Sequence, residues 1–167
     1  MIYIFSAFYA EAKNIIDHYG LKKEKSPEMV RFDVFANESI RLVITGVGEI
    51  NAAAAVSNIG GAYGISPDDE ILNVGCGAGF SSDICLGSIF LGNKLTEQMT
   101  GRTFYPDMLM NANFRECEIV TVARALNEGC DSVVYDMEAA AVYQAAAFFV
   151  GPHRMHSVSY THLRAHE

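Results

Sequence analysis

Short apolar runs alternate along the chain with segments of helical character, and this alternation most limits the folds that the chain can adopt. Ile2 to Phe5 is a short apolar run, and Glu11 to Tyr19 after it has helical character. Gly20 follows where a helix C-cap glycine is expected. Near the other end, the apolar run 133–136 precedes a helical, alanine-rich segment from Glu138 to Phe149. Strands that alternate with helices in this way predict an α/β layered fold.

One hairpin makes the predicted sheet mixed rather than purely parallel. Val30, Phe32 and Val34 alternate with charged residues, which is the period of a half-buried strand. After a turn at 37–39, Ile40 to Thr45 returns as a second, antiparallel strand. We therefore predict a three-layer α/β/α domain with a central mixed β-sheet over residues 1–157. The region 93–113 is poorly periodic and receives no prediction.

The last ten residues, 158–167, differ from the rest of the chain. They read VSYTHLRAHE, with neither strand alternation nor a capped apolar helix. The string resembles the translated end of a sequencing adapter, so we predict a non-native tail on a C-terminally truncated domain. His162 and His166 have a spacing that could place two metal ligands on one helical face. No acidic partner completes such a set, and no metal site is predicted.

Composition limits the partners and the location of the protein. A formal net charge of -8 and a pI near 5.0 argue against binding to a nucleic acid polymer. The N-terminus lacks the basic region of a signal peptide, and no run reaches the roughly 20 apolar residues of a membrane span. These features predict a soluble, cytoplasmic protein. The four cysteines show no paired spacing and are predicted to be buried, reduced thiols.

Three features could build a small-molecule site at the strand ends. Glu11 follows the first strand and is either a charge favoured by the start of a helix or a site carboxylate. The glycine turns at 46–48 and 75–79 let the backbone approach a ligand, but neither matches the GxGxxG dinucleotide fingerprint. Asp136, Met137 and Glu138 lie between a strand and a helix. They form either an acidic helix start or a carboxylate aimed into a cleft.

Four motifs taken together resemble one enzyme family. The stretches SAFYAEA, TGVGEINAAAA, NVGCGAG and YDMEAAA follow the order and layout of the methylthioadenosine/S-adenosylhomocysteine nucleosidases. More broadly, residues 1–157 are similar to the purine nucleoside phosphorylase superfamily. The resemblance implies a homo-oligomeric, dimeric enzyme of purine salvage that needs no cofactor and cleaves the N-ribosyl bond of a purine nucleoside with water. Two alternatives stay open: a phosphorylase that uses phosphate, and a non-catalytic nucleoside-binding protein.

The resemblance also implies roles for individual side chains. Glu11 matches the carboxylate that activates the attacking water. Glu138 matches the carboxylate that binds the ribose hydroxyls, and Met137 matches the methionine that lies against the sugar. Such roles suit the chemistry, because fixed negative charge stabilises a sugar that becomes oxocarbenium-like as the base departs.

Other matches concern the backbone and the missing end of the family pattern. Gly46 and Gly77 fall in turns that border the pocket, and Cys76 stands where these enzymes commonly carry a small hydroxyl residue. Arg102 and Asp107 belong to a GRTFYPD element without a family counterpart, so they are either substrate contacts or surface residues. Family members continue into a strand whose aspartate protonates the leaving base. Its replacement by the tail predicts impaired activity.

Overall fold

The computed structural model describes residues 1–81, 84–109 and 113–164. Within these residues the chain forms ten strands, three α-helices and one short 3-10 helix. The strands are β1 (Ile2–Ser6), β2 (Lys22–Lys23), β3 (Asp33–Ala36), β4 (Ile40–Ile44), β5 (Glu70–Gly79), β6 (Ile89–Glu97), β7 (Arg102–Phe104), β8 (Arg115–Thr121), β9 (Val133–Asp136) and β10 (Met155–Arg164). The helices are α1 (Tyr9–Tyr19), α2 (Glu49–Tyr63), α3 (Ala139–Ala146) and the 3-10 helix η1 (Pro152–Arg154).

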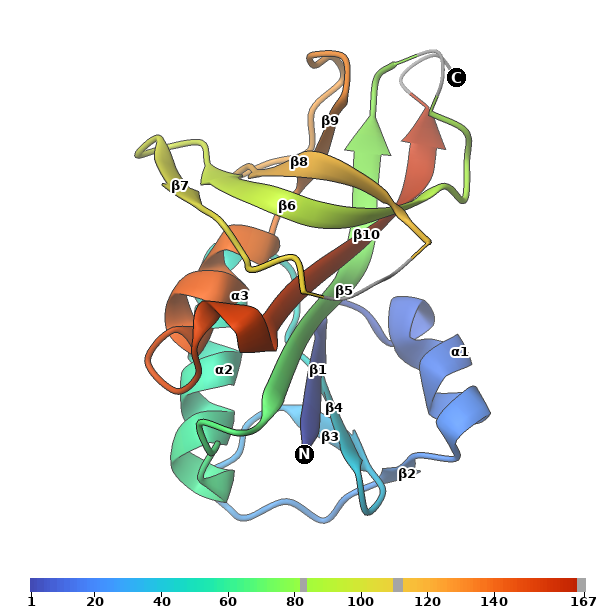
Figure 1. Ribbon diagram of the computed structural model, residues 1–167. Helices are drawn as coiled ribbons and strands as arrows, with labels where there is room; N and C mark the ends of the chain where they lie inside the picture. The colour runs from blue at the N-terminus through green and yellow to red at the C-terminus, as the bar shows by residue number, and fades with distance from the viewer. Residues whose placement is uncertain (82–83, 110–112, 165–167) are drawn as a thin grey trace.

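The described strands form one mixed sheet that closes on itself at one end (Figure 1). Strand β1 pairs in parallel with β4 and β5. Strands β3 and β4 form the predicted antiparallel hairpin, but β3 begins at Asp33 rather than at Val30. Strand β5 also pairs with β9 and β10. Strand β10 also pairs with β6, β6 pairs with β8, and β8 pairs with β9. Strands β5, β10, β6, β8 and β9 therefore form a closed ring.

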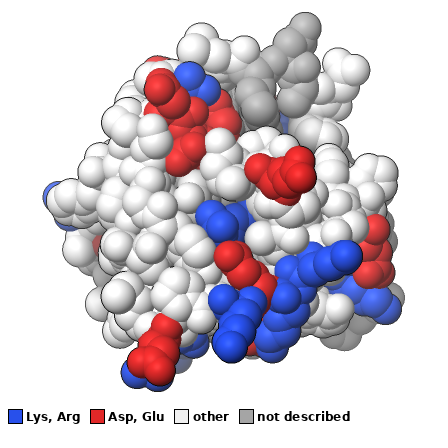
Figure 2. Space-filling view, turned by 90° about the horizontal axis from the view of Figure 1, so that it is seen from below, with Lys and Arg blue, Asp and Glu red and all other residues white. Residues whose placement is uncertain are grey.

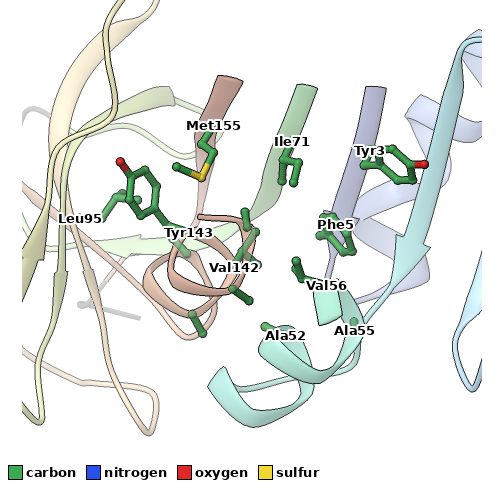
Figure 3. Close-up of a cluster of buried hydrophobic side chains, with 14 of the residues drawn as sticks. Tyr3, Phe5, Ala52, Ala55, Val56, Ile71, Leu95, Val142, Tyr143 and Met155 are labelled. Atoms are coloured by element: carbon green, nitrogen blue, oxygen red, sulfur yellow. The ribbon is translucent and has the colours of Figure 1, made fainter. Parts of the chain in front are cut away.

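Helices cover both faces of the open part of the sheet, with α1 on one side and α2 and α3 on the other (Figure 1). Side chains of β1 alternate between these faces, as the pleat requires. Ile4 packs with Ala12 and Ile16 of α1. Phe5 lies in the larger core with Val56 of α2, where α2 and α3 pack side by side (Figure 3). The predicted three-layer fold with a mixed sheet is therefore confirmed.

The glycine stretch 75–79 does not form the predicted turn. Strand β5 runs through it to Gly79, because β10 and β9 pair with this stretch and satisfy its backbone groups. Gly77 shows why glycine is needed here. A Cβ atom at Gly77 would lie 2.4 Å from Val134 Cγ1 and 2.5 Å from Ser159 Oγ, which is too close for any side chain. Gly77 permits close strand packing instead of a bend.

The segment 158–164, expected to lack strand structure, belongs to β10. It pairs in parallel with β5, and its residues 158–160 also pair antiparallel with β6, so this part is hydrogen-bonded on both edges. Residues 158–161 are buried or half-buried, and a strand covered on both faces does not need the alternating pattern of a half-exposed one. Residues 165–167, including His166, and the side chain of His162 lie outside the described part of the chain. The non-native origin of the tail stays a prediction.

The region 93–113, which carried no sequence prediction, contains the end of β6 and the short strand β7. Within β10, His156 Nε2 lies 3.5 Å from Glu70 Oε2, with which it forms an ion pair when protonated. All four cysteines are free, but only Cys117 is buried, and the prediction of burial was wrong for the exposed Cys85 and Cys130.

Basic and acidic side chains are interspersed on the face shown in Figure 2. Several basic side chains of the molecule are paired with acids, including Lys23 with Asp33 at 2.8 Å and Arg41 with Glu24 at 3.1 Å. No helix in the described part of the chain is long and apolar enough to cross a membrane. Among the same residues, no group of three or more His, Cys, Asp or Glu side chains is placed to hold a metal ion.

Candidate active site

A cavity of about 220 Å³ opens where several strands end. Residues that follow β1, β4, β8 and β9 by one to three positions contribute to its wall, together with the distal half of β5. The carboxyl ends of strands are where open α/β sheets place their ligands. The lining residues are Ala7, Phe8, Glu11, Val47, Cys76, Gly77, Ala78, Val122, Ala125, Leu126, Tyr135, Asp136, Met137 and Glu138.

Glu11 lies in the first turn of α1, and its carboxylate is held from two directions. The Ser6 hydroxyl and the Phe8 N–H donate to Oε2, each at 3.1 Å. The Cys76 N–H of β5 donates to Oε1 at 3.0 Å. A carboxylate oxygen has two acceptor positions, so Oε1 can still accept a hydrogen bond from a molecule in the cavity. Glu11 is therefore both a helix-start charge and an oriented cavity carboxylate, which unites the two sequence interpretations.

Glu138 lies directly before α3 and is 8% exposed. The N–H of Gly48, at the start of α2, donates to its Oε1 at 2.7 Å. Burial raises the pKa of the Glu138 carboxyl, the bond from Gly48 opposes this rise, and the nearby charge of Glu11 adds to it. The two glutamates, which the sequence places near opposite ends of the chain, thus line one cavity and repel each other within it.

Solved structures of similar architecture share this fold. An MTA/SAH nucleosidase matches 96% of the chain at 19% identity, with 80% of its own length covered and a TM-score of 0.81. The 5'-methylthioadenosine/S-adenosylhomocysteine nucleosidase of Neisseria meningitidis, in complex with methylthio-immucillin-A, matches 98% of the chain at 17% identity, with 86% of its length covered and a TM-score of 0.78. A futalosine hydrolase mutant of Helicobacter pylori matches 96% at 12% identity, with 88% covered and a TM-score of 0.79.

The chain has the MTA/SAH nucleosidase fold. No protein-family model matches the sequence, and no curated protein matches it. At these identities the likeness shows the nucleosidase fold, as the sequence resemblance predicted.

A third carboxylate, Asp136, lies at the end of β9 in this nucleosidase fold. Its Oδ1 accepts a hydrogen bond from the Thr121 hydroxyl at 2.7 Å, and its Oδ2 accepts one from the Ala139 N–H at 2.7 Å. Burial raises the pKa of Asp136 to about 7, the Thr121 bond opposes the rise, and the charge of Glu138 adds to it. Asp136 therefore changes its protonation state near neutral pH.

Replacing Asp136 by asparagine is expected to flatten the pH dependence of stability. Between about pH 4 and pH 7 the folded state holds a proton on Asp136 that the unfolded chain has already lost, so stability falls as pH rises through this interval. At 1.36 kcal/mol per pH unit, the loss reaches about 4 kcal/mol in the native chain and is absent from the variant. Urea unfolding at several pH values between 4 and 8 measures it.

Asp69 offers a control of opposite sign. Burial acts to raise its pKa, but the N-terminal amine and the Ser66 N–H outweigh this and lower it. Asp69→Asn should therefore lose stability at neutral pH and approach the native chain as pH falls below about 4. A D136N curve parallel to that of the native chain from pH 4 to pH 7 would contradict the buried titration.

The other site residues expected from the sequence divide into two groups. Met137, Cys76 and Gly77 line the cavity. Gly46 is absent from the cavity wall, and its neighbour Val47 takes that place. Gly46 instead has φ +78°, and its N–H donates to the Ala7 carbonyl at 3.1 Å, so it shapes the turn before α2.

Arg102 and Asp107 do not line the cavity. Both are exposed, and Arg102 donates to Gln144 at 3.3 Å. In the structure they are surface residues of the β7 region, which agrees with the second of the two interpretations left open by the sequence.

Three residues of the site were not singled out from the sequence. Gly48 holds Glu138 through its N–H, a role that no side-chain pattern reveals. Thr121 is a polar residue directly after the apolar Ile119 and Val120 at the end of β8, and that position was the available signal. Tyr160, in β10, lines a second cavity together with Glu11 and Cys76. Burial raises the pKa of the Cys76 thiol to about 12, so Cys76 stays protonated at neutral pH.

Proposed function

We propose that the protein hydrolyses the N-ribosyl bond of a purine nucleoside of the methylthioadenosine type. The proposal depends on one observation: the cavity presents Glu11, Asp136 and Glu138, while its described lining contains no Lys or Arg. A phosphate dianion in this cavity would face carboxylates, with no cationic side chain in the described lining to bind it. Water carries no such penalty, so the charge pattern supports hydrolysis over phosphorolysis.

In the proposed reaction Glu11 takes a proton from water as the water oxygen bonds to C1' of the ribose. Its orientation by Ser6 and Cys76 supports this role, since a general base must be held within hydrogen-bond reach of the proton that it removes. The C1'–N bond breaks, its electron pair leaves with the purine, and the purine takes up a proton from solvent. Glu138 binds the ribose hydroxyls, and its charge stabilises the cationic sugar.

Incubation of the full chain with methylthioadenosine, with and without inorganic phosphate, tests the proposal. We expect adenine release at rates within about twofold under both conditions, with free methylthioribose as the sugar product. Futalosine serves as a second substrate, because a futalosine hydrolase shares the fold. Release that requires phosphate and yields a sugar phosphate would overturn hydrolysis and favour the phosphorylase alternative.

We further propose that the protein is a cytoplasmic enzyme of purine salvage and that it acts as a homodimer. Two large apolar side chains support a subunit contact beside the site: Ile50 on α2 is 86% exposed, and Phe148 after α3 is 88% exposed. Both line a groove between α2 and α3, and Ile50 is two positions from the Gly48 that holds Glu138. Apolar side chains exposed together on one groove are typical of an interaction surface.

Phe148→Glu is expected to shift the protein from dimer to monomer, because a charge placed in an apolar interface lacks a partner there. Sedimentation velocity at micromolar concentration measures the shift. Leu109→Glu is the matched control, since Leu109 is 76% exposed but does not line the groove. A native chain that sediments as a monomer would contradict the dimer.

A further inference from the structure

The start of α3 is capped in an unusual way. Helices begin with N–H groups that have no partner within the helix, and the N-cap side chain commonly accepts one of them. Glu138 occupies the N-cap position, yet its side chain makes no capping hydrogen bond. Its carboxylate lies instead on the cavity wall, bound to the Gly48 N–H.

Two neighbouring strands supply the missing caps. Asp136, at the end of β9, accepts from the Ala139 N–H through Oδ2 at 2.7 Å. Thr121, at the end of β8, accepts from the Ala140 N–H through Oγ1 at 2.9 Å. The parallel register of β8 and β9 sets Thr121 beside Asp136, and the Thr121 hydroxyl donates to Asp136 at 2.7 Å. Thr121 is fully buried and Asp136 is 6% exposed, so water does not compete for these bonds.

We propose that Thr121 and Asp136 are positioning residues that cap α3 in place of Glu138 and thereby leave the Glu138 carboxylate free for the ribose. Without the pair, the N–H groups of Ala139 and Ala140 would lack acceptors and would attract the carboxylate of Glu138, which occupies the N-cap position. The carboxylate would then leave Gly48. The inference about the ribose rests on the proposed function, whereas the placement of Glu138 against Gly48 does not.

The Gly48 amide reports directly on this placement. In Thr121→Val, which keeps the shape of threonine and removes its hydroxyl, we expect hydrogen exchange at the Gly48 N–H to accelerate by about tenfold or more. The Ala52 N–H, which bonds to the Gly48 carbonyl at 3.0 Å, is the internal reference and should be unchanged. Thr121→Ser retains the hydroxyl and should restore native exchange at Gly48.

Thr100, in the turn between β6 and β7, provides a control elsewhere in the chain. Its hydroxyl also bonds to a buried carboxylate, that of Glu97, which in turn accepts from the Thr100 N–H at 3.0 Å. Neither residue lines the cavity. Thr100→Val should therefore leave exchange at Gly48 unchanged. Equal acceleration in T100V and T121V would show general loosening and overturn the positioning role.

A double-mutant cycle tests the link to the ribose. We expect Thr121→Val to lower kcat/KM for methylthioadenosine by about tenfold in the native background and by less than about twofold when Glu138 is already glutamine. A tenfold loss in both backgrounds would overturn the inference. If no variant cleaves any nucleoside, the proposed function fails while the exchange experiment still decides the placement. Native exchange at Gly48 in a folded T121V would overturn the positioning role even if the native chain is active.

Discussion

Replacing Glu11 by glutamine is expected to lower kcat for adenine release by about 10²- to 10⁴-fold, the usual contribution of a general base. An amide cannot take the proton from the attacking water. The fold should survive, because the amide oxygen can still accept from the Ser6 hydroxyl and the Phe8 N–H. Steady-state release of adenine from methylthioadenosine measures the loss, and KM should change far less than kcat.

Asp17→Asn is the matched control for this experiment, since Asp17 is an exposed acid on the same helix and lies away from the cavity. It should keep native kcat. An E11Q variant within about threefold of the native rate would remove Glu11 from the chemistry. If neither the native chain nor E11Q cleaves a nucleoside but both bind methylthioadenosine with equal affinity, the protein is the non-catalytic nucleoside-binding protein that the sequence left open.

Replacing Glu138 by glutamine is expected to lower kcat/KM by about 10- to 100-fold. A hydrogen bond to a charged group contributes about 1.5–3 kcal/mol, and each 1.36 kcal/mol changes a rate tenfold. The same change should not reduce stability at neutral pH. Burial raises the pKa of this carboxyl, so folding is opposed as pH rises through its titration, and the amide removes that opposition. Steady-state kinetics and urea unfolding on the same samples measure the loss of kcat/KM and the unchanged or higher stability.

A substrate change locates the contact. The 2'-deoxy analogue of the nucleoside lacks one hydroxyl that Glu138 is proposed to hold, so E138Q should affect the deoxy substrate much less than the ribonucleoside. Glu49→Gln is the control, because burial also raises the pKa of Glu49, which lies beside Gly48 but lines the groove between α2 and α3 instead. Equal losses for both substrates in E138Q would show that Glu138 does not bind the hydroxyls.

Elements defined by local chemistry were predicted well from the sequence. The helix that ends at Tyr19 stops at Gly20, which has the left-handed φ of 62° that glycine adopts most easily. The strand 133–136 was predicted with the bounds of β9. In both cases a strong capping residue or a clear boundary lies within a few positions, so neighbours in sequence suffice.

Elements defined by distant partners were predicted less well. The glycines 75–79 suggested a turn, and residues 158–164 suggested no regular structure, yet β5 and β10 pair with each other along this stretch. Each segment is a strand because the other lies beside it. Hydrogen bonds between strands distant in sequence leave no periodic signal in either one.

The candidate site shows the same division. By itself, the sequence determined that acidic residues stand where a strand meets a helix at both ends of the chain, because strand ends and helix starts are local features. Only the tertiary structure decided what holds them: Cys76, 65 positions from Glu11, and Gly48, 90 positions from Glu138, each donate a backbone N–H. Every residue except proline carries such a donor, so its identity reveals nothing until the fold sets its direction.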